Sequence, residues 1–272
     1  MKRVWNILLL TLVGILPAGC GRNASPTYQG YIEGEYVYVA APLGGALTNL
    51  AVARGGTVQA GQLLFTLERE AEAAALAGAK ENLAQAEATA ALSEITFKRR
   101  SELRQTPNGV ISAEELDQTR AQRDADAAVV ASQKAALAKA QWAFDQKQQF
   151  APTNAAVHDT LYRAGEWVAA GNPVVALLPP ENLRVRFFVP QAVLPRIQPG
   201  QRVRLHCDGA DRDFFAEVNY LSTRMEYTPP VIFSQNMREK LVFLVELSVD
   251  PETAKKLHPG QPVDVHFRLE KK

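Results

Sequence analysis

The sequence lacks the marks of several large functional classes. Only two cysteines, Cys20 and Cys207, occur among 272 residues, aromatic residues make up 8%, and the formal net charge is +1. A near-neutral chain has no field that favours nucleic acid or anionic lipid. The densest basic cluster, between Lys98 and Arg104, has only Phe97 as an aromatic neighbour, and a nucleic-acid surface needs more. We therefore expect no nucleic-acid partner.

Catalytic motifs are also missing. There is no phosphate-binding loop, no nucleophile elbow and no HExxH helix. We therefore expect a protein that is not an enzyme and uses no cofactor. No segment after Cys20 reaches about 18 apolar residues, so we expect that the mature chain does not span a membrane.

A metal site is conceivable at two histidines that occupy equivalent places in a repeat. His206 is followed by Cys207 and Asp208, and His266 matches it in the second copy. No further ligand follows at zinc-like spacing. Solvated histidines on a repeated strand explain the pattern better, and we expect no metal.

The N-terminus has the pattern of a secretory signal. Lys2 and Arg3 precede the apolar stretch Val4 to Leu16, and small residues surround Cys20. We assign residues 1–19 to a signal peptide. Residues 20–30, rich in Gly, Asn, Ser and Pro, are expected to form a linker.

The end of this signal resembles a bacterial lipobox, in which cleavage leaves a cysteine first and diacylglycerol is joined to its thiol. Ala18-Gly19-Cys20 fits that pattern, whereas Pro17 stands where leucine is usual. The resemblance implies a lipid on Cys20. The alternative is ordinary cleavage nearby, with Cys20 left free or removed. Cys207 would then be the one cysteine of the body, and we expect no intrachain disulfide there.

Two long stretches favour helix. Residues 68–105 and 112–149 are dominated by Ala, Glu, Leu and Gln, which are good helix formers. Between them, Pro107 stops the first helix, Asn108-Gly109 forms a turn, and Ser112 with Glu115 forms a capping box. Helices of about 37 residues, each roughly 55 Å long, are expected to fold back as an antiparallel hairpin over residues 69–149.

Seven-residue spacing indicates a coiled-coil seam along this hairpin. Small residues at Ala79, Ala86 and Ala140 would let the helices approach closely. Arg123 falls where the register predicts an apolar residue, which is explained either by fraying near the tip or by packing of the tip against another protein. The spaced apolar positions are Leu76, Leu83, Ala90 and Phe97 on the first helix and Val130, Leu137 and Phe144 on the second.

An internal repeat flanks the hairpin. The segment from Ala41 matches the segment from Ala151 without a gap, about 110 residues later. Two copies of one supersecondary unit therefore enclose the hairpin. Matched pairs are Leu47 with Val157, Gly55 with Gly165, Val58 with Val168, Gly61 with Gly171, and Leu64 with Val174.

The pattern Gly-x-x-Val-x-x-Gly-x-x-Leu resembles the halves of the biotinyl/lipoyl-carrier fold. A lipoyl-like domain split by a helical hairpin, behind a signal sequence, resembles the HlyD family of membrane fusion proteins, the periplasmic adaptors. This resemblance implies an α+β fold: a lipoyl/biotinyl-like β-domain (residues 31–68 and 150–180), split by a long antiparallel α-helical coiled-coil hairpin and followed by a β-barrel domain (residues 181–272).

The expected barrel contains a second repeat. Residues 199–206 (PGQRVRLH) match residues 259–266 (PGQPVDVH), and alternation places Val203, Leu205 and Cys207 on one face. Residues 222–240 are expected to form a membrane-proximal loop within this barrel.

The family resemblance also implies partners: an inner-membrane transporter, a TolC-like outer-membrane channel, and further copies of the chain in a ring, often a hexamer. Tyr227-Thr228-Pro229-Pro230 is similar to adaptors of ABC-type exporters. The chain would lie in the periplasm, anchored to the inner membrane by lipid on Cys20, although Gly21 is not the Asp that retains lipoproteins there.

Adaptors that engage such channels carry an Arg, a Leu four residues later and a Ser beyond the turn. Arg99, Leu103 and Ser112 match this motif, with Ser112 two residues farther than usual. The resemblance implies that these residues dock onto the channel. The ordinary explanations are a solvated helix face for Arg99 and a helix cap for Ser112.

Two other functions stay open. An acyl or biotin carrier subunit needs an exposed lysine in the turn between the lipoyl halves, and Leu67-Glu68-Arg69-Glu70 offers none. A structural coiled-coil envelope lipoprotein would have no use for the split repeat.

Overall fold

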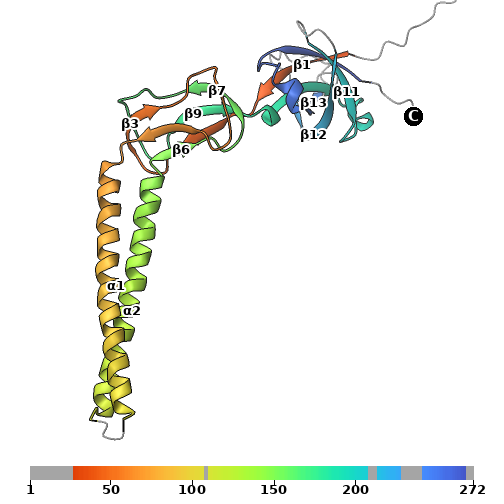
Figure 1. Cartoon of the computed structure of the whole chain (residues 1–272). Coiled ribbons are helices and arrows are strands. Elements are labelled where there is room, and N and C mark those ends of the chain that lie inside the picture. The colour runs from red at the N-terminus through yellow and green to blue at the C-terminus, as the bar shows by residue number, and fades with distance from the viewer. Residues whose placement is uncertain (1–26, 107–109, 208–212, 228–240, 268–272) are drawn as a thin grey trace, which may run out of the picture. The chain divides into compact units, whose positions relative to one another are not determined.

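The computed structural model describes residues 27–106, 110–207, 213–227 and 241–267 (Figure 1). These residues form two compact units. One unit contains residues 185–247 with the segments before residue 32 and after residue 260, and the other contains residues 32–184 and 248–260. The expected signal peptide, Cys20, Asp208 and the segment Thr228-Pro229-Pro230 lie outside the described residues.

The first unit is a closed barrel. Its core consists of strand residues that alternate inward, among them Phe187, Leu205, Leu247 and Val265, all of which are buried. Cys207 is buried, and its thiol donates to the Pro262 carbonyl oxygen at 3.4 Å. In barrel order the strands are β1 (Thr27–Gly34), β10 (Leu183–Pro190), β13 (Leu241–Val249), β12 (Phe214–Tyr227), β11 (Arg202–Cys207) and β14 (Pro262–His266).

The predicted repeat pairs with itself in this barrel. Strands β11 and β14 are antiparallel neighbours, with Leu205 opposite Val265 and Cys207 opposite Val263. Each copy contains, just before its strand, a glycine in the left-handed region: Gly200 with φ 81° and Gly260 with φ 89°. Glycine adopts this conformation without the steric cost of a Cβ atom.

Three segments differ from what the sequence predicts. Residues 222–227, assigned to a loop, form the end of β12, and the rest of that predicted loop, residues 228–240, lies outside the described residues. Residues 27–30, assigned to the linker, form the start of β1 and pair with β14, because the backbone hydrogen bonds of that edge need a partner strand. Residues 248–260, assigned to the barrel, belong to the unit that contains the lipoyl-like domain. This segment includes the short helix α3 (Pro251–Ala254), where side-chain and backbone hydrogen bonds from Thr253 hold the pKa of Asp250 below its ordinary value.

The second unit contains a flattened body of two four-stranded sheets. One sheet has the order β2-β9-β7-β4 and the other β6-β5-β3-β8. Short helical turns lie at η1 (Pro180–Asn182) here and at η2 (Leu194–Arg196) in the barrel unit. The strands are β2 (Val37–Ala40), β3 (Gly45–Leu50), β4 (Thr57–Val58), β5 (Leu63–Leu67), β6 (Gln148–Phe150), β7 (Ala155–Thr160), β8 (Trp167–Val168) and β9 (Pro173–Leu178).

The two repeat copies exchange equivalent hydrogen bonds. The Gly55 N–H donates to the Val157 carbonyl at 2.9 Å, and its counterpart Gly165 donates to Leu47 at 2.8 Å. These glycines have φ 82° and 93°, which strains any residue with a Cβ atom. The body is therefore made by two interlocked copies of one unit, which explains why the glycine spacing recurs.

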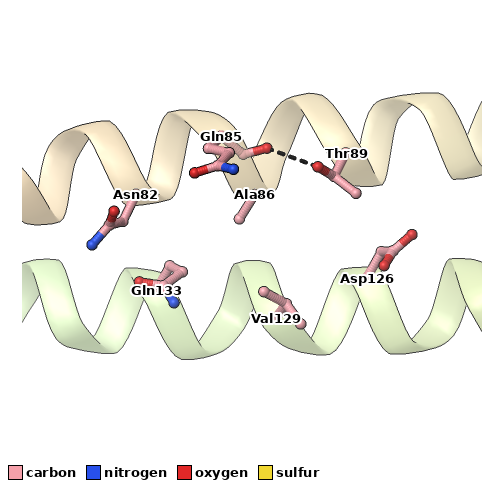
Figure 2. A pocket seen from close by; sticks show the side chains of 7 residues that line it. All are labelled: Asn82, Gln85, Ala86, Thr89, Asp126, Val129 and Gln133. Carbon is pink, nitrogen blue, oxygen red and sulfur yellow. Dashed lines mark hydrogen bonds between the residues drawn. The ribbon is translucent and has the colours of Figure 1, made fainter.

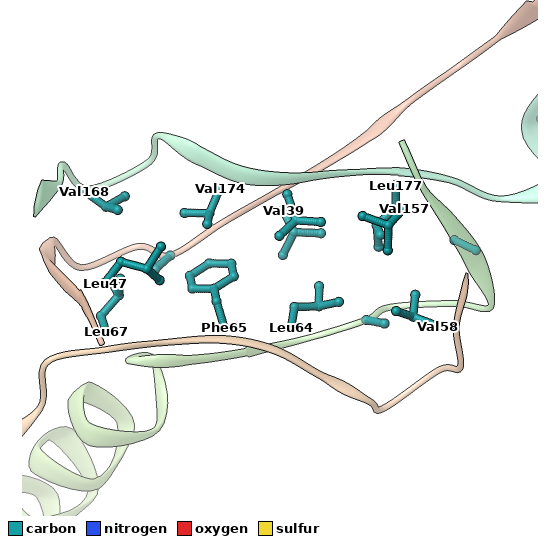
Figure 3. Close-up of a cluster of buried hydrophobic side chains, with 14 residues drawn as sticks. Val39, Leu47, Val58, Leu64, Phe65, Leu67, Val157, Val168, Val174 and Leu177 are labelled. Carbon is teal, nitrogen blue, oxygen red and sulfur yellow. The ribbon is translucent and has the colours of Figure 1, made fainter. Parts of the chain in front are cut away.

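Side chains from both copies meet in one apolar core (Figure 3). Val58 and its counterpart Val168 are buried, as are Leu64 and Val174. Phe65 lies at the centre of this view and is fully buried. Each such side chain stabilises the body by roughly 1.5–3 kcal/mol. Neither copy has a core without the other, so the body closes only after the chain returns from the hairpin.

The hairpin consists of α1 (Glu70–Arg104) and α2 (Ala113–Asp145), of 35 and 33 residues. Each helix extends about 50 Å at 1.5 Å per residue. The predicted α+β fold class, with its split β-domain, coiled-coil hairpin and barrel, is confirmed. Within the described residues, no helix combines the length and apolar character needed to cross a bilayer.

Candidate functional site

The hairpin is held by a seam with the predicted register. Leu76 and Ala86 are buried on α1, and Leu83, Phe97, Val130, Leu137 and Phe144 are half-buried. Facing residues lie at matched heights: the Lys134 ammonium is 3.6 Å from Glu87, and Arg100 donates to the Thr119 hydroxyl at 3.1 Å. Residues later on α1 therefore face residues earlier on α2, so the two helices run antiparallel.

Near the tip the seam is polar and its polar groups are paired. The guanidinium of Arg123 lies over the Phe97 ring at 4.3 Å and within 3.9 Å of the Glu94 carboxylate. Arg100 is 3.4 Å from Glu115 on the other helix. Fraying does not explain the break in the apolar pattern at Arg123, since both helices are continuous there.

Halfway along, the helices leave a polar groove of about 380 Å³ between them (Figure 2). The small side chain of Ala86 faces it from α1, and Val129 faces it from α2. The Thr89 hydroxyl donates to the Gln85 carbonyl at 3.1 Å, so that hydroxyl is satisfied within α1. The remaining lining residues are Asn82, Asp126 and Gln133, and the groove is a loosely packed part of the seam.

Arg99 and Leu103 lie one turn apart on α1, and both are exposed. Leu103 is 43% exposed although it is apolar and close to the tip. The contacts across the hairpin are made by the neighbouring Arg100 instead. The structure therefore leaves Arg99 and Leu103 on the outer surface. The seven-residue register agrees, because it continues from Phe97 to Arg104 and so passes over Leu103.

Ser112 has a structural role. It is the N-cap of α2, and its hydroxyl accepts a hydrogen bond from the Glu115 N–H at 3.1 Å. Replacing such a cap by alanine typically costs about 1 kcal/mol. The structure thus brings Arg99 and Leu103 together on one helix and gives Ser112 a separate task at the start of the other.

The root of the hairpin contains a residue that the sequence analysis missed. Lys147, which follows α2, is 5% exposed. Its ammonium lies 2.9 Å from the Glu72 carboxylate and donates to the Gly44 carbonyl at 2.7 Å. A methyl group on Gly45 would lie 3.2 Å from this ammonium, so the glycine leaves room for it.

Further contacts surround this buried ion pair. The Lys147 carbonyl accepts a hydrogen bond from the Leu67 N–H at 2.8 Å. The Arg69 guanidinium lies over the Phe144 ring at 4.7 Å, which joins the two helices at their base. The root is therefore a specific joint between both helices and strands β3 and β5.

This lysine also bears on the carrier alternative. A carrier needs a lysine that a modifying enzyme and its partner can reach, and Lys147 is the lysine at the junction of the two β-halves. Its ammonium is buried and paired with Glu72. The geometry therefore opposes modification at this position.

The histidines considered as metal ligands have other contacts. His206 Nδ1 lies 2.9 Å from an Asp213 carboxylate oxygen, and His266 Nδ1 lies 3.1 Å from the Thr27 hydroxyl. In the part of the chain that the structure describes, no group of three or more His, Cys, Asp or Glu side chains is arranged to hold a metal ion.

Comparison with known proteins identifies the hairpin. Residues 75–147 match the family described as RND MFP, alpha-helical hairpin domain. The hairpin is therefore similar to that of membrane fusion proteins, as the sequence analysis predicted. This family match covers the hairpin alone, and membership of the HlyD family stays a prediction.

Longer similarities cover the rest of the chain. A UPF0194 membrane protein of Enterobacter sp. (strain 638) is 25% identical, with 96% of each chain covered. MacA from Actinobacillus actinomycetemcomitans has a TM-score of 0.70 at 15% identity, covering 89% of this chain and 78% of that one. The membrane fusion protein Spr0693 from Streptococcus pneumoniae R6 has a TM-score of 0.64 at 21% identity, covering 91% and 100%. At these identities the structural likeness establishes a shared fold.

Proposed function

We propose that the chain is a non-enzymatic periplasmic adaptor of the HlyD family, which links an inner-membrane transporter of the ABC type to a TolC-like outer-membrane channel for export of small molecules. The observation that carries this proposal is a hairpin with a buried, ion-paired root at Lys147 and an exposed apolar side chain, Leu103, near its tip. The similarity to the RND MFP hairpin supports it. So does the fold shared with MacA.

The geometry of the hairpin suits a rigid spacer, which we call the strut. Helices of about 50 Å carry the tip away from the β-body. Their base is fixed by the Lys147–Glu72 ion pair and by backbone hydrogen bonds, so force at the tip reaches the body without a flexible linker. Copies of the chain would assemble as a ring, hexameric by family resemblance, with the hairpins side by side.

Tip docking follows from exposure. Leu103 offers an apolar side chain to a groove between partner helices, and Arg99 offers a cation one turn away. Ser112 supports this surface by capping α2 and so fixing where the second helix starts.

Shortening the hairpin tests whether its length is used. Removing residues 77–90 and 129–142 takes two heptads from each helix. The removed segments lie between two pairs that join the helices, Glu72 with Lys147 and Arg100 with Thr119. Because both helices lose the same number of residues between these pairs, the seam stays in register. The hairpin loses about 21 Å of reach. We expect the variant to accumulate normally but to lose protection of cells against a panel of toxic solutes, measured as growth inhibition.

Cells that make the parent protein and cells that lack the protein set the upper and lower limits of this test. Full protection by the shortened variant, at normal protein levels, would show that the hairpin does not span a fixed distance. The bridging function would then be abandoned.

Membrane attachment depends in this proposal on Cys20. A diacylglycerol group there would hold the chain at the periplasmic face of the inner membrane, since two acyl chains give stable anchoring. Replacing Cys20 by alanine should move the protein from the membrane fraction to the soluble periplasmic fraction. The matched control is Cys207→Ala, which alters a buried thiol of the barrel. Retention of the Cys20→Ala protein in membranes, with an unchanged N-terminal mass, would remove the anchor from the account.

A further inference from the structure

A second cavity lies on the β-body, remote from the hairpin root. It has a volume of about 550 Å³ and is bounded by β4, β7 and the segment from α3 to Pro259. All of its lining residues belong to one compact unit. Ligand pockets in proteins typically measure about 300–1,000 Å³, so this cavity has the size of a binding site.

Most of the wall is apolar. Leu178, Leu183 and Leu257 line the cavity; Leu178 is half-buried, and the other two are buried. The space stays open because small side chains stand at two places that could fill it, the outward-facing Ala156 of β7 and Ala254 of α3. An apolar wall of this kind favours a ligand with a hydrocarbon part.

The polar lining has one sign of charge. Arg54 and Lys255 line the cavity together with His158 and His258, and no acidic residue in the described part of the chain lines it. Two carboxylates stand behind these cations: Asp159 lies 3.8 Å from Arg54, and Glu252 lies 2.6 Å from Lys255. Both pairs are exposed, and exposed ion pairs are weak, so an incoming anion competes with them at little cost.

We propose that this cavity binds an amphipathic anion, with its hydrocarbon part against Leu178, Leu183 and Leu257 and its anionic group beside Arg54 and Lys255. Combined with the proposed function, on which this further step rests, such a molecule is the class of cargo that the adaptor meets in the periplasm. The same chemistry is offered by a free fatty-acid-like molecule and by an anionic membrane lipid. The test separates these two sources.

The probe is dodecanoate with a photoactivatable diazirine on its chain, added to the full-length protein in phosphatidylcholine nanodiscs. After illumination, mass spectrometry locates the label. We expect labelled peptides that contain residues 154–158 or 254–259. Unlabelled dodecanoate should compete about tenfold better than dodecanol or dodecylamine, because a hydrogen-bonded charged group adds that order of affinity.

Two adjacent lysines provide a matched pair of variants. Lys255 lines the cavity and Lys256 does not, although both are exposed. Lys255→Glu should reduce labelling severalfold, and Lys256→Glu should leave it unchanged. Ala156→Phe, which fills the cavity from an exposed strand position, should reduce labelling independently of charge.

Each outcome decides a part of the proposal. No label at these peptides in the parent chain overturns the site. Equal competition by dodecanol overturns the anionic group, and so does equal labelling of the two lysine variants. Loss of labelling when phosphatidylglycerol is added to the nanodiscs identifies a membrane lipid as occupant and overturns the cargo assignment. No transporter or channel is present, so these results do not depend on the bridging function.

Discussion

Replacing Glu72 by leucine is expected to lower the free energy of unfolding by about 3–5 kcal/mol, because it leaves the buried Lys147 ammonium without its carboxylate. Among the residues that the structure describes, the Gly44 carbonyl would then be the partner left to the ammonium of Lys147, a residue that is 5% exposed. Urea unfolding followed by tryptophan fluorescence is the measurement. Trp142 in α2 and Trp167 in β8 report on the hairpin and the body, respectively.

A double replacement separates the charge from the packing. Glu72→Leu combined with Lys147→Met exchanges the ion pair for apolar side chains of similar volume, which is often close to neutral. We therefore expect the double variant to recover most of the stability that the single variant loses.

The exposed pair of Glu87 and Lys134 provides the control. Its atoms are 3.6 Å apart and both side chains are more than half exposed, so Glu87→Leu should cost less than about 1 kcal/mol. Equal losses for Glu72→Leu and Glu87→Leu would mean that the root is not maintained by the buried pair, and the rigid strut would lose its physical basis.

The fold could be predicted from the sequence where local patterns, such as turns, caps and heptads, or an internal repeat determine it. Gly55 and Gly165 stand about 110 residues apart, and both adopt positive φ at equivalent turns. The seven-residue spacing from Leu76 to Phe97 matches the observed seam, and Ser112 caps the helix that it was expected to start. Each of these features depends on near neighbours or on a pattern repeated in the chain.

Features that depend on contacts between distant residues could not be predicted from the sequence. Nothing near Lys147 in the sequence distinguishes it from other lysines, since its burial depends on Gly44 and Gly45, far earlier in the chain. The start of β1 has the composition of a linker, and pairing with β14 makes it a strand. The α3 segment likewise joins the unit of the β-body through contacts that no local pattern announces.

The candidate site at the hairpin tip also contains both features that the sequence predicts and features that depend on distant residues. The seven-residue register continues from Phe97 to Arg104, which leaves Leu103 off the seam, and Leu103 is indeed exposed. Arg123 was correctly placed in the seam, but its partners Phe97 and Glu94 come from the other helix, and a single-residue pattern cannot show how a polar seam position is satisfied. The docking roles of Arg99, Leu103 and Ser112 stay predictions.

Charge at the tip provides the second large expected effect. Leu103→Asp should leave folding nearly intact, because exposed substitutions usually change stability by about 0.5 kcal/mol or less. It should weaken docking by tenfold or more, because an unpaired carboxylate would be buried against the partner. Arg99→Asp should act in the same direction by reversing the charge.

Two neighbours control for these changes. Leu92 is an exposed leucine on α1 farther from the tip, and Lys98 is an exposed cation next to Arg99. Leu92→Asp and Lys98→Asp introduce the same carboxylate away from the proposed contact, and both should dock normally.

The most direct measurement is crosslinking in living cells. A photoreactive amino acid at position 106, next to the tip residues and exposed, would capture whatever protein the tip meets. The account predicts an adduct with the outer-membrane channel that falls at least about tenfold in Leu103→Asp and Arg99→Asp and persists in Leu92→Asp and Lys98→Asp. An adduct of equal yield in all five proteins, or no channel adduct in the parent at normal protein levels, would contradict it.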